Sequence, residues 1–133
     1  MTPKIPLWIN LLQALILAIL LFQTYACYLD PGLIYPGIRI EGLPASKAIN
    51  VLGGRNAVMA LISIIALVWQ EPRFYSFAFL MHSAREAQDM FITPLHTPDT
   101  TVALILFAVF LFVFVIPEII ATRMLWRFAN GKP

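Results

Sequence analysis

The chain has few charged residues and a single cysteine, and both shortages limit the classes of protein to which it can belong. Only 12% of its 133 residues are charged, whereas soluble domains carry about 25%. The net charge of +2 is small, so the charge balance does not indicate nucleic acid as a partner. The single cysteine, Cys27, excludes a disulfide within the chain and a cysteine metal centre.

The sequence also lacks the common catalytic and nucleotide-binding motifs. No GxSxG, HExxH, CxxC, Walker loop or GxGxxG is present. Ser83 follows His82 directly, which sends the two side chains to different faces of a helix and disfavours a Ser–His nucleophile. We therefore expect a protein without a catalytic site or a metal site, and no pattern names a cofactor.

Apolar residues, by contrast, make up 60% of the chain, and the mean hydropathy of +0.82 is typical of an integral membrane protein. Four segments reach or exceed the ~20 residues that a membrane-spanning helix needs. The predicted fold class is all-α, a four-transmembrane-helix bundle with a long first outer loop. A single integral membrane domain, residues 1–133, would contain helices at about 5–28, 48–69, 74–92 and 101–126.

The orientation follows from the lysines and arginines that flank these segments. With both termini inside, the cytoplasmic side carries five of them and the outer side carries Arg39 and Lys47. We therefore expect a multi-pass protein of a cell's inner membrane with both termini in the cytoplasm. A cleaved signal peptide is the alternative for the first segment, but its apolar run exceeds the usual ~7–15 residues. The five inner residues are Lys4, Arg73, Arg123, Arg127 and Lys132.

A charged stripe interrupts the third segment. His82, Arg85, Glu86 and Asp89 are spaced three, four and seven apart, so they share one helix face. A tight turn at 70–72 predicts that Arg55 lies level with them, and two arginines would then face two carboxylates. The glycines before Arg55 would let the second and third helices approach closely.

Three interpretations of this stripe stay open. It is a structural ion network that locks two helices together, or it lines a pocket in the outer half of the membrane for a headgroup, a quinone-like molecule or a proton. The third interpretation is that the segment lies partly outside lipid. His82, the lone intramembrane histidine, is expected to be a hydrogen-bonded packing residue rather than a ligand of haem or pigment magnesium.

A second polar site is predicted nearer the cytoplasmic side. Glu118 follows Pro117 in the fourth segment, and Pro117 is expected to kink the helix. Asn10 and Gln13 of the first segment lie at a similar depth and could hydrogen-bond the carboxyl group. A proton relay through Glu118 is the alternative.

The plan of the chain resembles the DoxX-like group of small four-helix bacterial membrane proteins, within which the closest likeness is to families of unknown function. The resemblance rests on Pro36-Gly37 in the first loop, on Gly53-Gly54-Arg55-Asn56 before the apolar run to Leu67, and on the acidic end of the third helix at Asp89. It implies an accessory subunit of a membrane oxidoreductase.

We therefore expect a small non-catalytic membrane protein that acts as an accessory or assembly subunit of a larger redox-type membrane complex. Its partners would be membrane lipids and another membrane protein or a second copy of itself. The alternative is a lipid- or quinone-binding protein, or an isomerase-like enzyme, with its pocket at Arg55, Glu86 and Asp89. A proton-coupled transporter is a third possibility.

Overall fold

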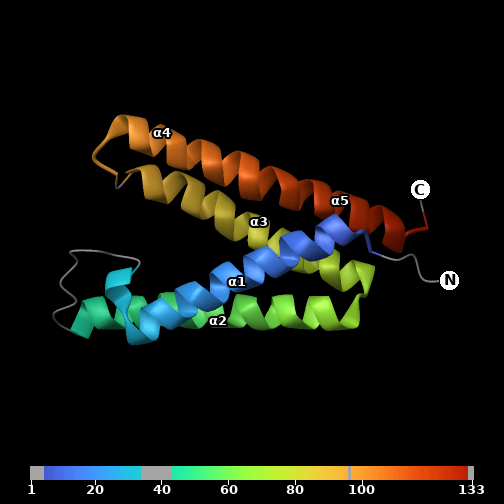
Figure 1. The fold of residues 1–133 in the computed structure, drawn as a ribbon, viewed down its shortest axis with the longest axis horizontal. Coiled ribbons are helices and arrows are strands. Elements are labelled where there is room, and N and C mark those ends of the chain that lie inside the picture. The colour runs from blue at the N-terminus through green and yellow to red at the C-terminus, as the bar shows by residue number, and fades with distance from the viewer. Residues whose placement is uncertain (1–4, 34–42, 96, 132–133) are drawn as a thin grey trace. The chain divides into compact units, whose positions relative to one another are not determined.

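The computed structural model describes residues 5–33, 43–95 and 97–131, and all regular structure in these ranges is helical. Its helices group into two compact units: unit 2 is Leu7–Trp69, and unit 1 holds the helices that follow Gln70. Each unit contains its own pair of packed helical rods (Figure 1). The sequence predicts that the two units form a single domain, and this stays a prediction.

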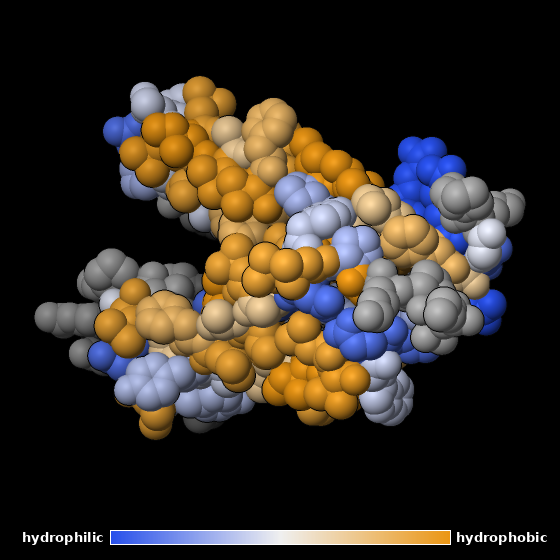
Figure 2. Space-filling view, turned by 45° about the vertical axis from the view of Figure 1, so that its right-hand side comes forward, coloured by the Kyte–Doolittle hydropathy of each residue, from blue (hydrophilic) through white to orange (hydrophobic). Residues whose placement is uncertain are grey.

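Among the described residues, three helices are long and apolar enough to cross a membrane, which suggests a multi-pass membrane protein. They are Leu7–Leu29, Ser46–Trp69 and Thr100–Ala129. Figure 2 shows apolar side chains over much of the surface in view. The third predicted segment is also a helix, but its charged stripe leaves it short of the apolar character of the other three.

Unit 2 is a pair of helices, α1 (Leu7–Leu29) and α2 (Leu43–Trp69), with a short 3₁₀ turn, η1 (Pro31–Leu33), after α1. The buried side chains of α1 include Gln13, Leu20 and Cys27, which are spaced seven residues apart and so share one face of the helix. Near the end of α1, the Tyr28 hydroxyl donates a hydrogen bond to the Asn50 carbonyl oxygen at 3.2 Å. Helix α1 packs against α2.

Helices α1 and α2 lie very close together at Gly53. A Cβ atom built on Gly53 would lie 2.9 Å from Cys27 Cβ and 2.9 Å from Tyr28 Cε2, distances that real Cβ atoms do not show. The sequence predicted a close approach at this glycine, but toward the third helix. That assignment was wrong, because helical periodicity alone does not say which neighbour a small residue faces.

Two helices begin earlier than predicted because proline fits the first turn of a helix. The second helix starts at Leu43 rather than 48, with Pro44 inside its first turn. Helix α3 (Pro72–Leu95) starts at its proline rather than at 74 and ends three residues beyond the predicted 92. Glu71 caps it: Phe74 N–H donates to Glu71 Oε2 at 2.6 Å and Tyr75 N–H to the Glu71 carbonyl at 2.9 Å.

The last rod is continuous from Thr100 to Ala129 but changes its hydrogen-bond pattern midway. Helix α4 (Thr100–Val109) leads into a π-helical stretch, η2 (Phe110–Val115), and then α5 (Ile116–Ala129). Asp99 caps α4 by accepting from Thr101 N–H at 2.8 Å and Val102 N–H at 3.1 Å. Pro117 was expected to kink this rod. The structure has a π-helical segment that ends two residues before the proline, and the kink itself stays a prediction.

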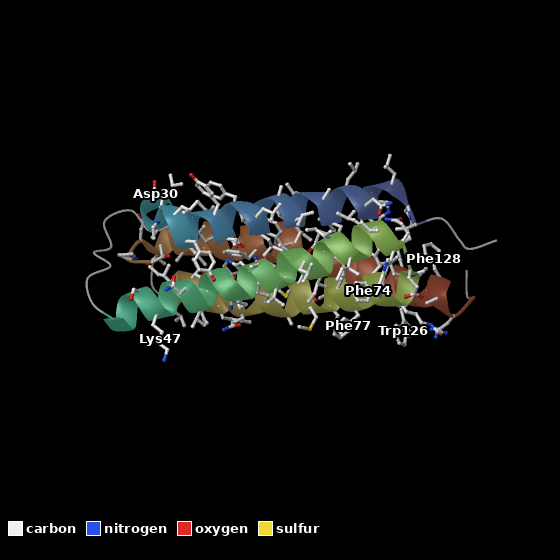
Figure 3. The ribbon with its side chains drawn as sticks, turned by 90° about the horizontal axis from the view of Figure 1, so that it is seen from below. Asp30, Lys47, Phe74, Phe77, Trp126 and Phe128 are labelled. Carbon is white, nitrogen blue, oxygen red and sulfur yellow. The ribbon has the colours of Figure 1, made fainter. Side chains whose placement is uncertain are left out.

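Unit 1 is held together by α3, which packs along α4, η2 and α5. Phe91 of α3 meets Phe107 of α4 with ring centroids 6.1 Å apart. Nearer the other end, the Ser76 hydroxyl donates to the Thr122 carbonyl oxygen at 3.1 Å. Figure 3 shows the aromatic residues of this end of the unit, Phe74, Phe77, Trp126 and Phe128.

Gly53→Ala should destabilise the α1–α2 pair by about 1–3 kcal/mol, because the added methyl group overpacks a contact with no spare room. Gly54→Ala is the matched control: its Cβ would lie 3.5 Å from the Tyr28 hydroxyl, an ordinary contact, so it should be neutral or slightly stabilising. The thermal unfolding midpoint in detergent measures both. Equal midpoints for the two variants would contradict this packing.

Candidate functional site

The charged stripe of α3 is buried. His82 is 0% exposed, Arg85 7% and Glu86 4%, and all three belong to the face that helical spacing predicts. On the other face, Phe77 and Leu80 are both more than half exposed. Helix α3 thus turns its polar side inward and its apolar side outward, the reverse of a helix at the surface of a soluble protein.

Arg85 is the centre of an ion-pair network. Its Nη2 atom contacts Glu86 Oε1 in a buried ion pair, and its Nε atom lies 3.9 Å from Asp89 Oδ2, the i,i+4 partner that the spacing predicts. The pair with Glu86 was not indicated, because neighbouring residues leave a helix about 100° apart. The long arginine side chain bridges that angle. Asp89 is the most exposed member, with 29% of its side chain accessible.

Glu118 of α5 joins this cluster, which the sequence analysis did not predict. Its side chain is 0% exposed, and Glu86 and Arg85 are the charged groups that act on it electrostatically. The signal that could have found it is the register of the last hairpin: Ser76 meets Thr122, which places Glu118 about level with Leu80 on α3.

Within the described part of unit 1, this cluster therefore combines the Arg85 guanidinium with three carboxyl groups, those of Glu86, Asp89 and Glu118. Only one positive charge is available inside the cluster for up to three negative ones. Ionised groups without a counter-charge are costly in hydrocarbon. The cluster thus needs either further positive charge or a proton on at least one carboxyl group.

Three predicted site residues belong to unit 2. Arg55 lies on α2, and Asn10 and Gln13 lie on α1, where Gln13 is completely buried. The predicted contact between Arg55 and the charged stripe stays a prediction, as does the predicted site formed by Asn10, Gln13 and Glu118. Pro36 and Gly37 of the first loop lie outside the described residues.

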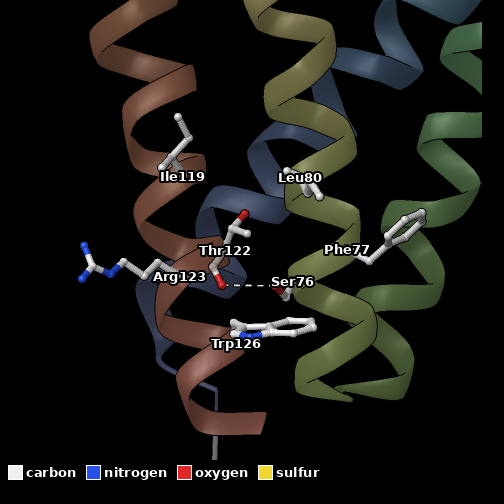
Figure 4. A pocket seen from close by; sticks show the side chains of 7 residues that line it. All are labelled: Ser76, Phe77, Leu80, Ile119, Thr122, Arg123 and Trp126. Carbon is white, nitrogen blue, oxygen red and sulfur yellow. Dashed lines mark hydrogen bonds between the residues drawn. The ribbon is translucent and has the colours of Figure 1, made fainter. Parts of the chain in front are cut away.

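A pocket of about 360 Å³ lies between α3 and α5. Figure 4 shows Trp126 across its lower edge and the Ser76–Thr122 hydrogen bond at its back. A second, more open pocket of about 540 Å³ lies along α1 and η1 in unit 2. Neither pocket is lined by Arg55, Glu86 or Asp89, the residues at which a pocket was predicted. The first pocket is lined by Ser76, Phe77, Leu80, Ile119, Thr122, Arg123 and Trp126.

The chemistry of these residues fits charge pairing and proton binding. Among the residues that the structure describes, no group of three or more histidine, cysteine, aspartate and glutamate side chains is arranged to hold a metal ion.

The walls of the α3–α5 pocket are mostly apolar side chains. Such walls suit the tail of an amphiphile rather than a polar substrate.

Arg85→Gln should destabilise the protein by about 3–5 kcal/mol, because it leaves Glu86 buried without its cation. Arg73→Gln, at an exposed position in the same helix, is the matched control and should have little effect. The unfolding midpoint in detergent and the amount of protein in the membrane measure this difference. If the two variants behave alike, the cluster contributes nothing to stability.

Comparison with protein-family models, curated proteins and solved structures finds no match for this chain. The resemblance to DoxX-like proteins therefore rests on the quoted residues and stays a prediction.

Proposed function

We propose that this chain is a small multi-pass protein of the bacterial inner membrane that acts as a non-catalytic accessory subunit of a larger membrane complex. The observation that carries the proposal is the exposure of the last rod. In the apolar stretch of Thr100–Ala129 only 11% of the residues are buried within the protein. A helix that is apolar all round needs cover from lipid or from other helices. The redox type of the complex is what the DoxX-like resemblance implies.

The proposal includes four membrane crossings with both termini in the cytoplasm. Helix α3 has 24 residues, about 36 Å at 1.5 Å per residue, which is enough to cross a bilayer. Its buried polar face supports a crossing, because Arg85 and Glu86 need not meet lipid. The orientation is supported by Arg73 at the start of α3 and Arg123 and Arg127 near the end of α5, which fall at one end of the antiparallel pair.

The exposed side chains of the last rod supply the surface for a partner. Leu104 and Phe112 are 66% and 65% exposed and eight residues apart, so they share a face of the rod. Lipid tails are as apolar as these side chains, so no hydrophobic driving force brings helices together in a membrane. Van der Waals packing of the side chains is therefore a main source of helix association. Helix α2 offers a comparable pair of exposed residues, Val51 and Val58.

In mild detergent the protein should co-purify with a membrane partner at a fixed ratio. The double variant Leu104→Ala/Phe112→Ala should reduce the recovered partner about tenfold or more, because each truncated contact residue costs roughly 1 kcal/mol or more of binding. Val51→Ala/Val58→Ala is the control and should retain the partner. Quantitative mass spectrometry of the purified material measures the ratio. A lone, monodisperse protein would contradict the subunit proposal.

A lipid- or quinone-binding function is the second candidate, and the α3–α5 pocket favours it. Its apolar walls fit an acyl or isoprenoid chain, and Arg123 is the cationic side chain among its lining residues. In Figure 4 the Arg123 side chain extends away from the space between the helices. A headgroup bound to it would therefore sit outside the apolar walls.

Leu80→Trp should fill the pocket and lower the amount of quinone or phospholipid that solvent extracts from the purified protein by about tenfold. Met81→Trp is the control, because Met81 is the neighbouring exposed residue and does not line the pocket. Chromatography with mass spectrometry of the extract identifies the bound molecule. Equal extracts from the two variants would remove this candidate.

A further inference from the structure

Among the carboxyl groups that the structure describes, that of Glu118 differs from the others in its surroundings. It is 0% exposed, and neither of its oxygens has a hydrogen-bond partner among the described residues. Glu118 also follows the π-helical stretch Phe110–Val115 directly after Pro117, and π-helical turns are frequent at functional sites. Burial, missing partners and a local break in the helix thus coincide at one acidic residue.

Within the described part of unit 1, the charged groups around Glu118 do not neutralise an ionised Glu118 carboxylate. Helices α3 and η2 are the elements of unit 1 that pack against α5. The η2 sequence, FLFVFV, contributes no titratable group. Helix α3 contributes the Arg85 guanidinium and the Glu86 carboxylate, with His82 buried on the same face and Asp89 at its edge. Because Arg85 is already paired with Glu86, an ionised Glu118 would add a negative charge without a cation of its own.

We propose that unit 1 contains a proton-binding site at Glu118, in which the Arg85–Glu86 pair of α3 sets the charge balance. A proton from water binds the carboxylate and gives a neutral carboxylic acid, with no other bond formed or broken. The neutral group gains an O–H donor. Thr122, one turn further along α5 and on the same helix face, has a buried hydroxyl oxygen without a hydrogen-bond partner among the described residues, and we expect it to accept from this donor. The neutral acid therefore removes an unpaired charge from the membrane interior.

Labelling with dicyclohexylcarbodiimide tests the site, because this apolar reagent enters membranes and reacts with protonated carboxyl groups. The full-length protein in native membranes should take up the reagent on Glu118, as located by peptide mass spectrometry. Glu118→Gln should lower the labelling at least tenfold. Glu71→Gln is the control, because Glu71 is exposed at the start of α3, and it should label as the unchanged protein does.

The charge balance has its own test. Glu86→Gln removes the closer of the two carboxylates that pair with Arg85, so the guanidinium should then stabilise an ionised Glu118, and labelling of Glu118 should fall severalfold. Mapping of the adduct in the unchanged protein needs no variant and holds even if Glu118→Gln fails to accumulate. An adduct on Glu86 or Asp89 instead of Glu118, no adduct at all, or full labelling in Glu86→Gln would each overturn the proposal. None of these results depends on a partner complex.

Discussion

The arrangement of unit 1 depends on one constraint: if α3 crosses the membrane, as we propose, its charged stripe must be hidden from hydrocarbon. Exposed to lipid, a charged residue near the centre of a helix costs about 2.5–3.5 kcal/mol on insertion scales. The structure meets this constraint by turning His82, Arg85 and Glu86 into the protein and leaving Phe77 and Leu80 outside. The hydrogen bond from Ser76 to Thr122 then fixes how far α5 is shifted along α3.

The helices of unit 2 are held together by different interactions. Its helices carry almost no charge, and in lipid their apolar surfaces gain little by meeting each other. Close backbone contact and a hydrogen bond take the place of that driving force. Gly53 allows Cys27 and Tyr28 to lie against α2, and the Tyr28 hydroxyl bonds to Asn50. A bulky residue at Gly53 would separate the two helices at this end.

The same features that stabilise unit 1 are the ones available for function. A cluster with more carboxyl groups than guanidinium groups is stable in a membrane only while its charge is adjusted, by a proton or by further cations. The apolar pocket between α3 and α5 lies beside that cluster in the same helix pair and is lined by different side chains.

Much of the fold follows from the sequence by itself. Hydropathy located four helical segments, and three are long and apolar enough to cross a membrane. Helical spacing placed Arg85 beside Asp89. These features are local, since they depend on residues within a few turns of one another. Helix ends differed by up to five residues because proline is compatible with the first turn of a helix.

Only the tertiary structure decided what each face meets. Gly53 approaches α1, although it was expected to face the third helix, and Glu118 joins the Arg85 cluster, which was not expected. Periodicity says which residues share a face, but the partner of that face depends on the register and packing of whole helices. A hydrophobicity pattern therefore determines that these helices exist and which side is polar. The positions of Glu118 and Gly53 depend on contacts between residues far apart in the chain.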